Sequence, residues 1–318
     1  MLRDEIIELS IVVPVYNEEE SLKNLYSELC VTLQRRDVTS EVIFVDDGSS
    51  DQSVEAIQNL ISGNSTHHLI ELRRNYGQTA AMAAGFESSK GRVVIPLDAD
   101  GQNDPADIWK LYDFLGTDFD CVSGWRKTRK DKTFSRKLPS AIANRMILWA
   151  TGIQIHDSGC TIKAYNGELI RSIQLYGEMH RLIPFYIHLA GGMVTEMEVN
   201  HRSRNFGSSK YGISRTFRVI QDVLVAKVQA DFARRPMHLF GNIGLISVGL
   251  GTVAALSSVA LKISGARDFT QTPLLQIASL LVVMGFQFAL TGLLAEIVIR
   301  KVNLGAADRP YAVKKRKR

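Results

Sequence analysis

Short apolar runs alternate with amphipathic segments in the first part of the chain. Strands buried on both faces of a parallel sheet read as near-continuous apolar runs. Runs of this kind occupy residues 9–13, 41–45, 68–72, 92–97 and 121–124. Between the first two runs, Leu22, Leu25, Leu29 and Leu33 recur every three or four residues, which predicts a helix over residues 18–33. The alternation predicts an α/β fold, a doubly wound and mostly parallel sheet.

Two much longer apolar stretches follow in the last third of the chain. Residues 239–261 and 274–295 contain no charged residue. About 20 apolar residues in a helix cross the roughly 30 Å hydrocarbon layer of a bilayer, and the Gly and Ser content suits close packing of helices in lipid. We therefore expect two transmembrane helices. A pair of buried helices in a soluble domain is the alternative, which such long charge-free stretches disfavour.

The positive charge of the chain is confined to its end. The net charge is +5, but residues 300–318 carry eight Lys or Arg and one Asp, which leaves −2 for residues 1–299. A basic body that binds nucleic acid is therefore not indicated. By the positive-inside rule the tail is cytoplasmic, and two spans put the N-terminal part on the same side. The tail is expected to meet anionic headgroups, and no signal peptide is visible.

Acidic and polar clusters follow three of the predicted strands. They read PVYNEE, DDGSSD and DADGQ, and parallel strands bring such ends to one edge of the sheet, where ligands bind. Asp98 and Asp100 are two residues apart, so their carboxylates share one face, and Gln102 adds an oxygen. Hard oxygen ligands suit Mg²⁺ or Mn²⁺ shared with substrate phosphates. The alternative is an acidic turn that caps the next helix.

Six segments carry a family resemblance. In chain order they are SIVVPVYNEE, EVIFVDDGSSD, RRNYGQTAAMAAGF, PLDADGQNDP, DSGCTIKAY and GSSKYG. Together they resemble family 2 glycosyltransferases with the GT-A fold, and more narrowly the polyprenyl-phosphate glycosyltransferases, the group of dolichyl-phosphate mannose synthase and the bacterial undecaprenyl-phosphate sugar transferases. The resemblance covers nearly the whole chain, including the paired apolar stretches.

The resemblance implies an activity and a place in the cell. It implies inverting, metal-dependent transfer of a sugar from a nucleotide-diphosphate sugar to a polyisoprenyl phosphate at the cytoplasmic membrane face, for assembly or modification of envelope glycans. The DSGCTIKAY and GSSKYG segments look closest to bacterial envelope enzymes, which favours a UDP-sugar over a GDP-sugar. The implied location is the bacterial inner membrane, with the catalytic domain and the C-terminus cytoplasmic.

The resemblance also assigns roles to single residues. Donor-nucleotide contacts are expected at Pro14, Tyr16, Glu18, Val45, Asp47 and Asp98, and the metal and diphosphate site at Asp98, Asp100 and Gln102. Acceptor-phosphate contacts are expected at Arg126, Arg136, Ser140, Lys163 and Lys210. Asp157, Asp100 and Arg126 are the expected catalytic residues. Some relatives carry an acid directly after the glycine of the DSGC segment, where this chain has Cys160, so Asp157 can equally be a structural cap.

Four segments are expected along the chain. Residues 1–212 form the GT-A domain, residues 213–237 a juxtamembrane region, residues 238–299 the two-helix membrane domain and residues 300–318 the basic tail. Ser214–Arg235 combines apolar positions at helical spacing with basic neighbours. This pattern fits an amphipathic helix at the membrane interface, or equally one packed on the catalytic domain.

The chemistry of the acceptor supports the same activity without the resemblance. A phosphate monoester is already an anion near neutral pH, so it needs positioning and charge compensation rather than a strong base.

Alternatives are a non-catalytic membrane scaffold or sugar-nucleotide sensor, and a transferase with a non-lipid acceptor. A processive polysaccharide synthase is disfavoured because no QxxRW segment occurs. Small residues in the spans permit a homo-oligomer.

Overall fold

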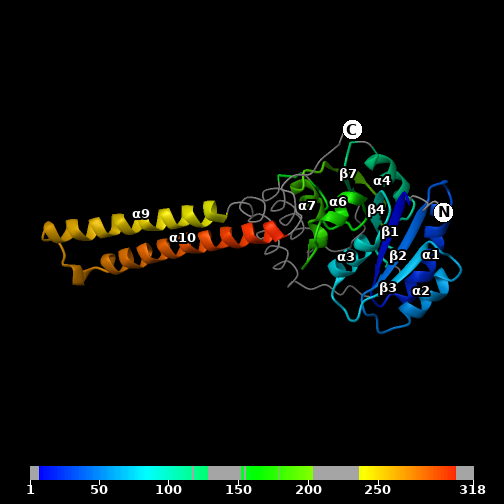
Figure 1. The fold of residues 1–318 in the computed structure, drawn as a ribbon, viewed down its shortest axis with the longest axis horizontal. Coiled ribbons are helices and arrows are strands. Elements are labelled where there is room, and N and C mark those ends of the chain that lie inside the picture. The colour runs from blue at the N-terminus through cyan, green and yellow to red at the C-terminus, as the bar shows by residue number, and fades with distance from the viewer. Residues whose placement is uncertain are drawn as a thin grey trace. The chain divides into compact units, whose positions relative to one another are not determined.

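The computed structural model describes residues 7–116, 118–127, 152–153, 155–177, 179–202 and 236–305, with side chains up to Val298. These residues fall into two compact units. The first contains an α/β sheet and the second contains two long helices (Figure 1). The expected juxtamembrane helix and the basic tail lie outside the described residues.

The first unit is built on a seven-stranded sheet of order β3-β2-β1-β4-β6-β5-β7. Strands β1 to β4 pair in parallel, β6 runs antiparallel to both β4 and β5, and β5 pairs in parallel with β7. The strands are β1 (Leu9–Val15), β2 (Ser40–Asp46), β3 (His67–Glu71), β4 (Val93–Pro96), β5 (Cys121–Trp125), β6 (Lys163–Asn166) and β7 (Val194–Glu198). The prediction of a doubly wound, mostly parallel sheet is confirmed.

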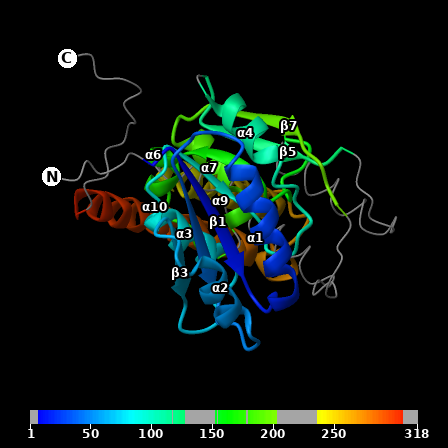
Figure 2. The ribbon, with the colours of Figure 1, turned by 90° about the vertical axis from the view of Figure 1, so that its right-hand side faces the viewer.

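Helices cover both faces of this sheet (Figures 1 and 2). One face packs against α1 (Glu19–Leu33), α2 (Ser53–Ile61) and α4 (Asp107–Leu115) through one apolar cluster. The other face packs against α3 (Gln78–Ser88), α6 (Gly167–Ser172) and α7 (Ile183–Leu189) through a second cluster. A 3₁₀ turn, η1 (Met179–Arg181), precedes α7. The strands read as near-continuous apolar runs because helices bury both faces of the sheet.

The second unit is an antiparallel helical hairpin. It consists of α9 (Pro236–Ile263), a 3₁₀ turn η2 (Phe269–Gln271) and α10 (Leu274–Gly305). Both long helices are apolar enough to cross a membrane, and 17% of the most apolar window of each is buried. A core helix of a soluble protein would be mostly buried, so the exposed apolar surface agrees with the two spans predicted from the sequence.

Small residues at seven-residue spacing form the contact between the two helices. Gly244, Gly251 and Ser258 are the buried positions of α9 after Pro236. A Cβ on Gly244 would lie 2.7 Å from the carbonyl oxygen of Gly285, and one on Gly285 would lie 2.5 Å from the Val248 side chain. The helices therefore approach each other this closely at Gly244 and Gly285 because these two glycines lack side chains.

Candidate active site

The loops after β1 and β2 are tied together by hydrogen bonds at the carboxyl edge of the sheet. The backbone N–H of Asn17 donates to Ser49 Oγ at 2.9 Å, and the N–H of Ser50 donates to Asn17 Oδ1 at 2.8 Å. The N–H of Glu18 donates to Ser53 Oγ at 3.0 Å. Parallel pairing of β1 with β2 places both loops at the same edge. The PVYNEE and DDGSSD clusters thus form one continuous rim, as the sequence predicts.

Asp47 connects this rim to the start of α3. Its Oδ1 accepts the N–H of Tyr76 at 2.7 Å, and its Oδ2 accepts the N–H of Gly77 at 2.8 Å. Burial raises the pKa of Asp47, and these two bonds act in the opposite direction. Gly48 has a φ of +69°, and a Cβ there would lie 2.5 Å from the backbone of Arg74. Only glycine permits this approach of the two loops.

The residues expected to contact the nucleotide divide into two sets. Tyr16 is 38% exposed, and Pro14 and Glu18 are partly buried, so this set lies at the rim. Val45 is fully buried, in the cluster beneath α3, and Asp47 is 3% exposed. Val45 therefore lies in the core beneath α3, and Asp47 lies under the rim, where it accepts the N–H groups of Tyr76 and Gly77.

Asp98 and Asp100 follow β4 at the same edge. Asp98 Oδ1 accepts a bond of 2.9 Å from Gln78 Nε2, and Asp98 also has a side-chain hydrogen bond with Thr161. Burial and then the neighbouring charge of Asp100 raise the pKa of Asp98 to about 6, while Thr161 and the nearby Arg126 act in the opposite direction. The negative charge of Asp100 therefore disfavours ionisation of Asp98.

The donor set at this position fits a divalent cation shared with a substrate. Among the described residues, no three His, Cys, Asp or Glu side chains gather to hold a metal ion. Two carboxylates leave coordination positions for phosphate oxygens, as hard cations such as Mg²⁺ require. The Asp100 Oδ1 also accepts the N–H of Gln102 at 3.0 Å, which shapes the turn after β4. Gln102 is partly buried in that turn.

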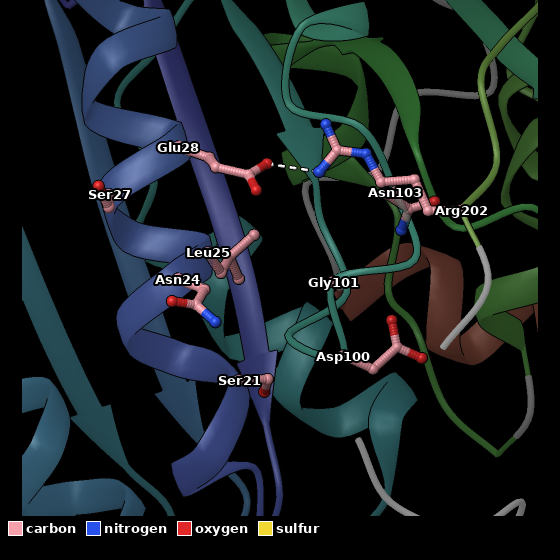
Figure 3. A pocket seen from close by; sticks show the side chains of 9 residues that line it. All are labelled: Ser21, Asn24, Leu25, Ser27, Glu28, Asp100, Gly101, Asn103 and Arg202. Carbon is pink, nitrogen blue, oxygen red and sulfur yellow. Dashed lines mark hydrogen bonds and ion pairs between the residues drawn. The ribbon is translucent and has the colours of Figure 1, made fainter. Parts of the chain in front are cut away.

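A shallow groove of about 230 Å³ lies beside Asp100, between the turn after β4 and α1. Figure 3 shows the side chains of α1 on one wall and Asp100, Gly101 and Asn103 on the other. Arg202 crosses its upper end and pairs with Glu28 at 2.6 Å. Most residues that line the groove are polar or charged, and Asp100 joins it to the acidic edge of the sheet.

Arg126 and Asp157 form a two-pronged ion pair next to this acidic edge. Arg126 Nε donates to Asp157 Oδ2 at 2.7 Å, and Nη2 donates to Oδ1 at 3.1 Å. The side chains are 16% and 5% exposed. Burial acts to lower the pKa of Arg126, but the bonds and charge of Asp157 outweigh it and raise that pKa. The structure thus brings together Arg126 and Asp157, two of the three residues predicted to be catalytic. Both carboxylate oxygens of Asp157 accept hydrogen bonds from Arg126.

Lys163 lies beneath the loop that carries Asp157. It is 2% exposed, and its Nζ donates to the backbone carbonyl oxygens of Ser158, at 3.4 Å, and Cys160. Burial lowers the pKa of this amine. Since β6 pairs with β5 through Lys163 and Ser123, the lysine also lies next to the strand that ends at Trp125, one residue before Arg126. In this structure its amine holds the loop that carries Asp157.

Three predicted site residues lie outside the described part of the chain, and two residues that contact Asp98 were not predicted as site residues. Arg136, Ser140 and Lys210, all expected at the acceptor phosphate, are outside the described residues. Gln78 and Thr161 contact Asp98 although neither was predicted to. Both belong to quoted segments, RRNYGQTAAMAAGF and DSGCTIKAY, so the signal for them was their place in those motifs.

In open α/β sheets ligands bind at the carboxyl ends of the strands, and in this structure the acidic clusters lie at that edge. Residues 10–173 match the model of glycosyl transferase family 2. Dodecaprenyl-phosphate galacturonate synthase of Rhizobium johnstonii is 39% identical, over 97% of this chain and 92% of that protein. Undecaprenyl-phosphate 4-deoxy-4-formamido-L-arabinose transferase of Pectobacterium carotovorum is 34% identical, over 98% and 94%. The chain belongs to glycosyl transferase family 2, and it is a glycosyltransferase.

Solved structures agree on the fold. Glucosyl-3-phosphoglycerate synthase of Mycobacterium tuberculosis, crystallised with Mn²⁺ and UDP-glucose, has a TM-score of 0.52 and 15% identity, and covers 70% of this chain and 78% of its own. Mannosyl-3-phosphoglycerate synthase of Rubrobacter xylanophilus has a TM-score of 0.53 and 14% identity, with 70% and 74% covered. The predicted GT-A fold is confirmed.

Proposed function

We propose that this protein transfers a sugar from a nucleotide-diphosphate sugar to a polyprenyl phosphate, with inversion at the anomeric carbon. The observation that carries the proposal is that Asp98 interacts electrostatically both with Asp100 and with Arg126, whose guanidinium is bound by Asp157. The two neighbouring carboxylates suit a cation and a diphosphate, and Arg126 presents a guanidinium. The full-length match to relatives named for polyprenyl-phosphate acceptors supports a lipid acceptor.

The donor is proposed to bind on the rim formed after β1, β2 and β4. Tyr16 and Glu18 would meet the nucleoside, and Asp47 and Val45 would fix the loops beneath it. Asp98 and Asp100, with Gln102 beside them, would hold Mg²⁺ or Mn²⁺ with the diphosphate. A bound divalent cation would neutralise the negative charge that develops on the leaving diphosphate. UDP is the proposed nucleotide, on the resemblance of the DSGCTIKAY and GSSKYG segments to bacterial envelope enzymes.

Arg126 is proposed to hold the acceptor phosphate. Among the described residues, Asp157 takes Nε and Nη2 of the guanidinium, and arginine carries further N–H donors on Nη1. Arginine matches phosphate oxygens well. Asp157 then orients Arg126, and Lys163 fixes the loop that carries Asp157. Arg136, Ser140 and Lys210 are proposed to complete this phosphate site.

The reaction needs no strong general base. A phosphate oxygen of the acceptor attacks the anomeric carbon, and the bond from that carbon to the diphosphate oxygen breaks. The electron pair leaves with the nucleoside diphosphate, and one displacement inverts the configuration. Because the attacking phosphate is already ionised, the protein contributes position and compensating charge.

The hairpin of α9 and α10 is proposed to span the bacterial inner membrane, with the catalytic unit and the basic tail on the cytoplasmic side. The support is the length and exposed apolar surface of both helices and the eight basic residues after the second one. The same membrane supplies the acceptor lipid.

The test uses membranes that contain the full chain. They are incubated with a panel of labelled UDP- and GDP-sugars, Mg²⁺ or Mn²⁺, and a short polyprenyl phosphate, and label in the organic extract is measured. We expect lipid-linked label with a UDP-sugar, its loss with EDTA and with Asp100→Asn, and its retention with Asp113→Asn, an exposed acid of α4. Label in water-soluble product alone would establish a non-lipid acceptor, and no transfer from any donor would leave the scaffold or sensor alternative.

A further inference from the structure

The turn after β4, residues 98–104, is open on part of the side that faces α1. It carries Asp100, which is proposed to hold the metal, and a groove of about 230 Å³ separates it there from α1. Among the described residues, nothing lies within 4 Å of a Cβ at Gly101. Packed interiors hold few voids larger than a water molecule, so this part of the turn is not fixed by packing. Its position depends on the hydrogen bonds at its ends.

The segment after β7 pairs with the main chain of this turn. The backbone N–H of Arg202 donates to the carbonyl oxygen of Gln102 at 2.9 Å. Asn103 and His201 form an antiparallel bridge next to this bond. Because these contacts belong to the main chain, they survive substitution of the Arg202 side chain.

The Arg202 side chain joins the same turn to α1. Its Nη1 donates to Glu28 Oε2 at 2.6 Å, and its Nη2 donates to Asp104 Oδ1 at 3.0 Å. Glu28 belongs to α1 and Asp104 to the turn, so one guanidinium bridges the groove (Figure 3). At the other end, Ser21 Oγ of α1 donates to the carbonyl oxygen of Ala99 at 2.7 Å. The chain between Ala99 and Asp104, which carries the expected metal ligand, is therefore tied to α1 at both ends.

The bridge from Arg202 to Glu28 is too exposed to matter much for the stability of the fold. The two side chains are 42% and 47% exposed, close to the 40% and 54% of Arg36 and Asp113. Exposed ion pairs contribute little to stability because water screens them. The effect of Arg202 is therefore local, and it restricts the movement of the turn.

We propose that Arg202 is a positioning residue for the metal, which holds the Asp100 carboxylate in place through the turn. The inference rests on the proposed function, since it assumes a divalent cation at Asp98 and Asp100. Groups that hold metal ligands in place raise the affinity for the metal, because the ligands need not be ordered when it binds. Loss of the bridge weakens binding of the cation but leaves the fold intact.

The experiment titrates Mn²⁺ into the solubilised full chain with saturating UDP and measures the free ion by electron paramagnetic resonance. The binding that Asp100→Asn removes defines the site. We expect Arg202→Gln to weaken this binding about tenfold, the lower end of the loss when groups that hold metal ligands are replaced. Arg202→Lys, which keeps the charge beside Glu28 and Asp104, should lie between Arg202→Gln and wild type. Arg36→Gln, the control from a pair of similar exposure, should bind Mn²⁺ as wild type does.

Glu28→Gln tests whether Arg202 acts through α1. It should weaken Mn²⁺ binding less than Arg202→Gln does, because Asp104 still holds the guanidinium. The double variant should bind Mn²⁺ no more weakly than Arg202→Gln alone, since both substitutions remove one shared contact. In transfer assays with Arg202→Gln, the KM for Mn²⁺ should rise while kcat at saturating Mn²⁺ stays near that of wild type. The metal-free melting temperature should match that of Arg36→Gln.

Failure of this proposal differs from failure of the proposed function. Binding of Mn²⁺ by Arg202→Gln equal to that of wild type would overturn the proposal. So would losses from Glu28→Gln and Arg202→Gln that add in the double variant, or a metal-free melting temperature of Arg202→Gln well below that of Arg36→Gln. If wild type and Asp100→Asn bound Mn²⁺ equally, the proposed cation site itself would be wrong, and the role of Arg202 would be overturned with it.

Discussion

Arg126 and Asp157 form a buried two-pronged ion pair through Nε and Nη2 of the arginine, and Arg36 and Asp113 form a two-pronged pair through Nη1 and Nη2 at the surface. The first pair is 16% and 5% exposed and the second is 40% and 54% exposed. Removing one partner of a buried pair leaves an uncompensated charge, which costs about 3–5 kcal/mol, whereas exposed pairs contribute about 0–1 kcal/mol. The two pairs therefore offer a matched comparison of a structural surface contact with a site contact.

We expect Arg126→Ala to abolish measurable transfer and to lower the free energy of unfolding by several kcal/mol. Arg36→Ala should leave the rate of transfer unchanged and shift stability by about 1 kcal/mol or less. Asp157→Asn, which keeps the shape of the partner but removes its charge, should reduce transfer less than Arg126→Ala does. Urea unfolding of the solubilised chain and the rate of lipid labelling measure both effects. If Arg36→Ala and Arg126→Ala reduced the rate of transfer and the stability equally, the buried pair would have no particular role in the reaction.

Asp98→Asn is expected to stabilise the metal-free protein while it prevents transfer. Burial and the charge of Asp100 raise the pKa of Asp98 from 3.8 to about 6. Between these two values the native state binds more protons than the unfolded state, so stability falls as pH rises through this window. At about pH 8 the ionised carboxylate therefore costs up to about 3 kcal/mol, which the asparagine avoids while keeping an oxygen for Gln78 and Thr161.

The check is thermal unfolding of wild type and Asp98→Asn, both with EDTA, at about pH 8 and about pH 4. The variant should melt higher at the upper pH, and the difference should shrink at the lower one. Added Mn²⁺ and nucleotide should stabilise wild type but not the variant. A variant that melts at a lower temperature than wild type at both pH values would show that the ionised carboxylate of Asp98 does not destabilise the folded protein.

Lys163 is expected to act through the loop that it holds. Lys163→Met removes the amine that bonds the carbonyl groups of Ser158 and Cys160, so Asp157 and Arg126 lose their fixed position. We expect kcat to fall about 10–100-fold, as for a misplaced positioning group, with little change in the KM for the nucleotide sugar. Steady-state kinetics with both substrates measure this. A large rise in the KM for polyprenyl phosphate with unchanged kcat would instead make Lys163 a phosphate ligand.

Most of the fold was predictable because apolar periodicity reports burial directly. The runs at residues 9–13 and 41–45 became the central strands β1 and β2, and both apolar stretches became long helices. The antiparallel strand β6 was not predicted, because its four residues begin with Lys163 and carry no strand pattern of their own. Its pairing with β4 and β5 is decided by tertiary contacts.

The site was predictable only where a residue type dictates its chemistry. Asp98 and Asp100 could be proposed as metal ligands from oxygen chemistry and strand spacing, and that assignment stays a prediction. The burial of Lys163 could not, because a lysine is normally exposed and only the packed loop shows where its amine goes. Gln78 could not be singled out either, since its bond to Asp98 joins the start of α3 to the loop after β4, twenty residues further along the chain.

The close contact in the hairpin predicts a strong difference between two glycines of the same unit. A side chain at Gly285 would lie 2.5 Å from the side chain of Val248 and 2.8 Å from the carbonyl oxygen of Gly244, whereas nothing lies within 4 Å of a Cβ at Gly249. Gly285→Leu should force the helices apart, at a cost of about 1–3 kcal/mol as in other overpacked contacts. Gly249→Leu adds the same apolar volume on an open face and should leave the hairpin intact. Thermal unfolding of the detergent-solubilised chain, with limited proteolysis at the turn before α10, compares them. Equal melting temperatures for the two variants would contradict the glycine contact.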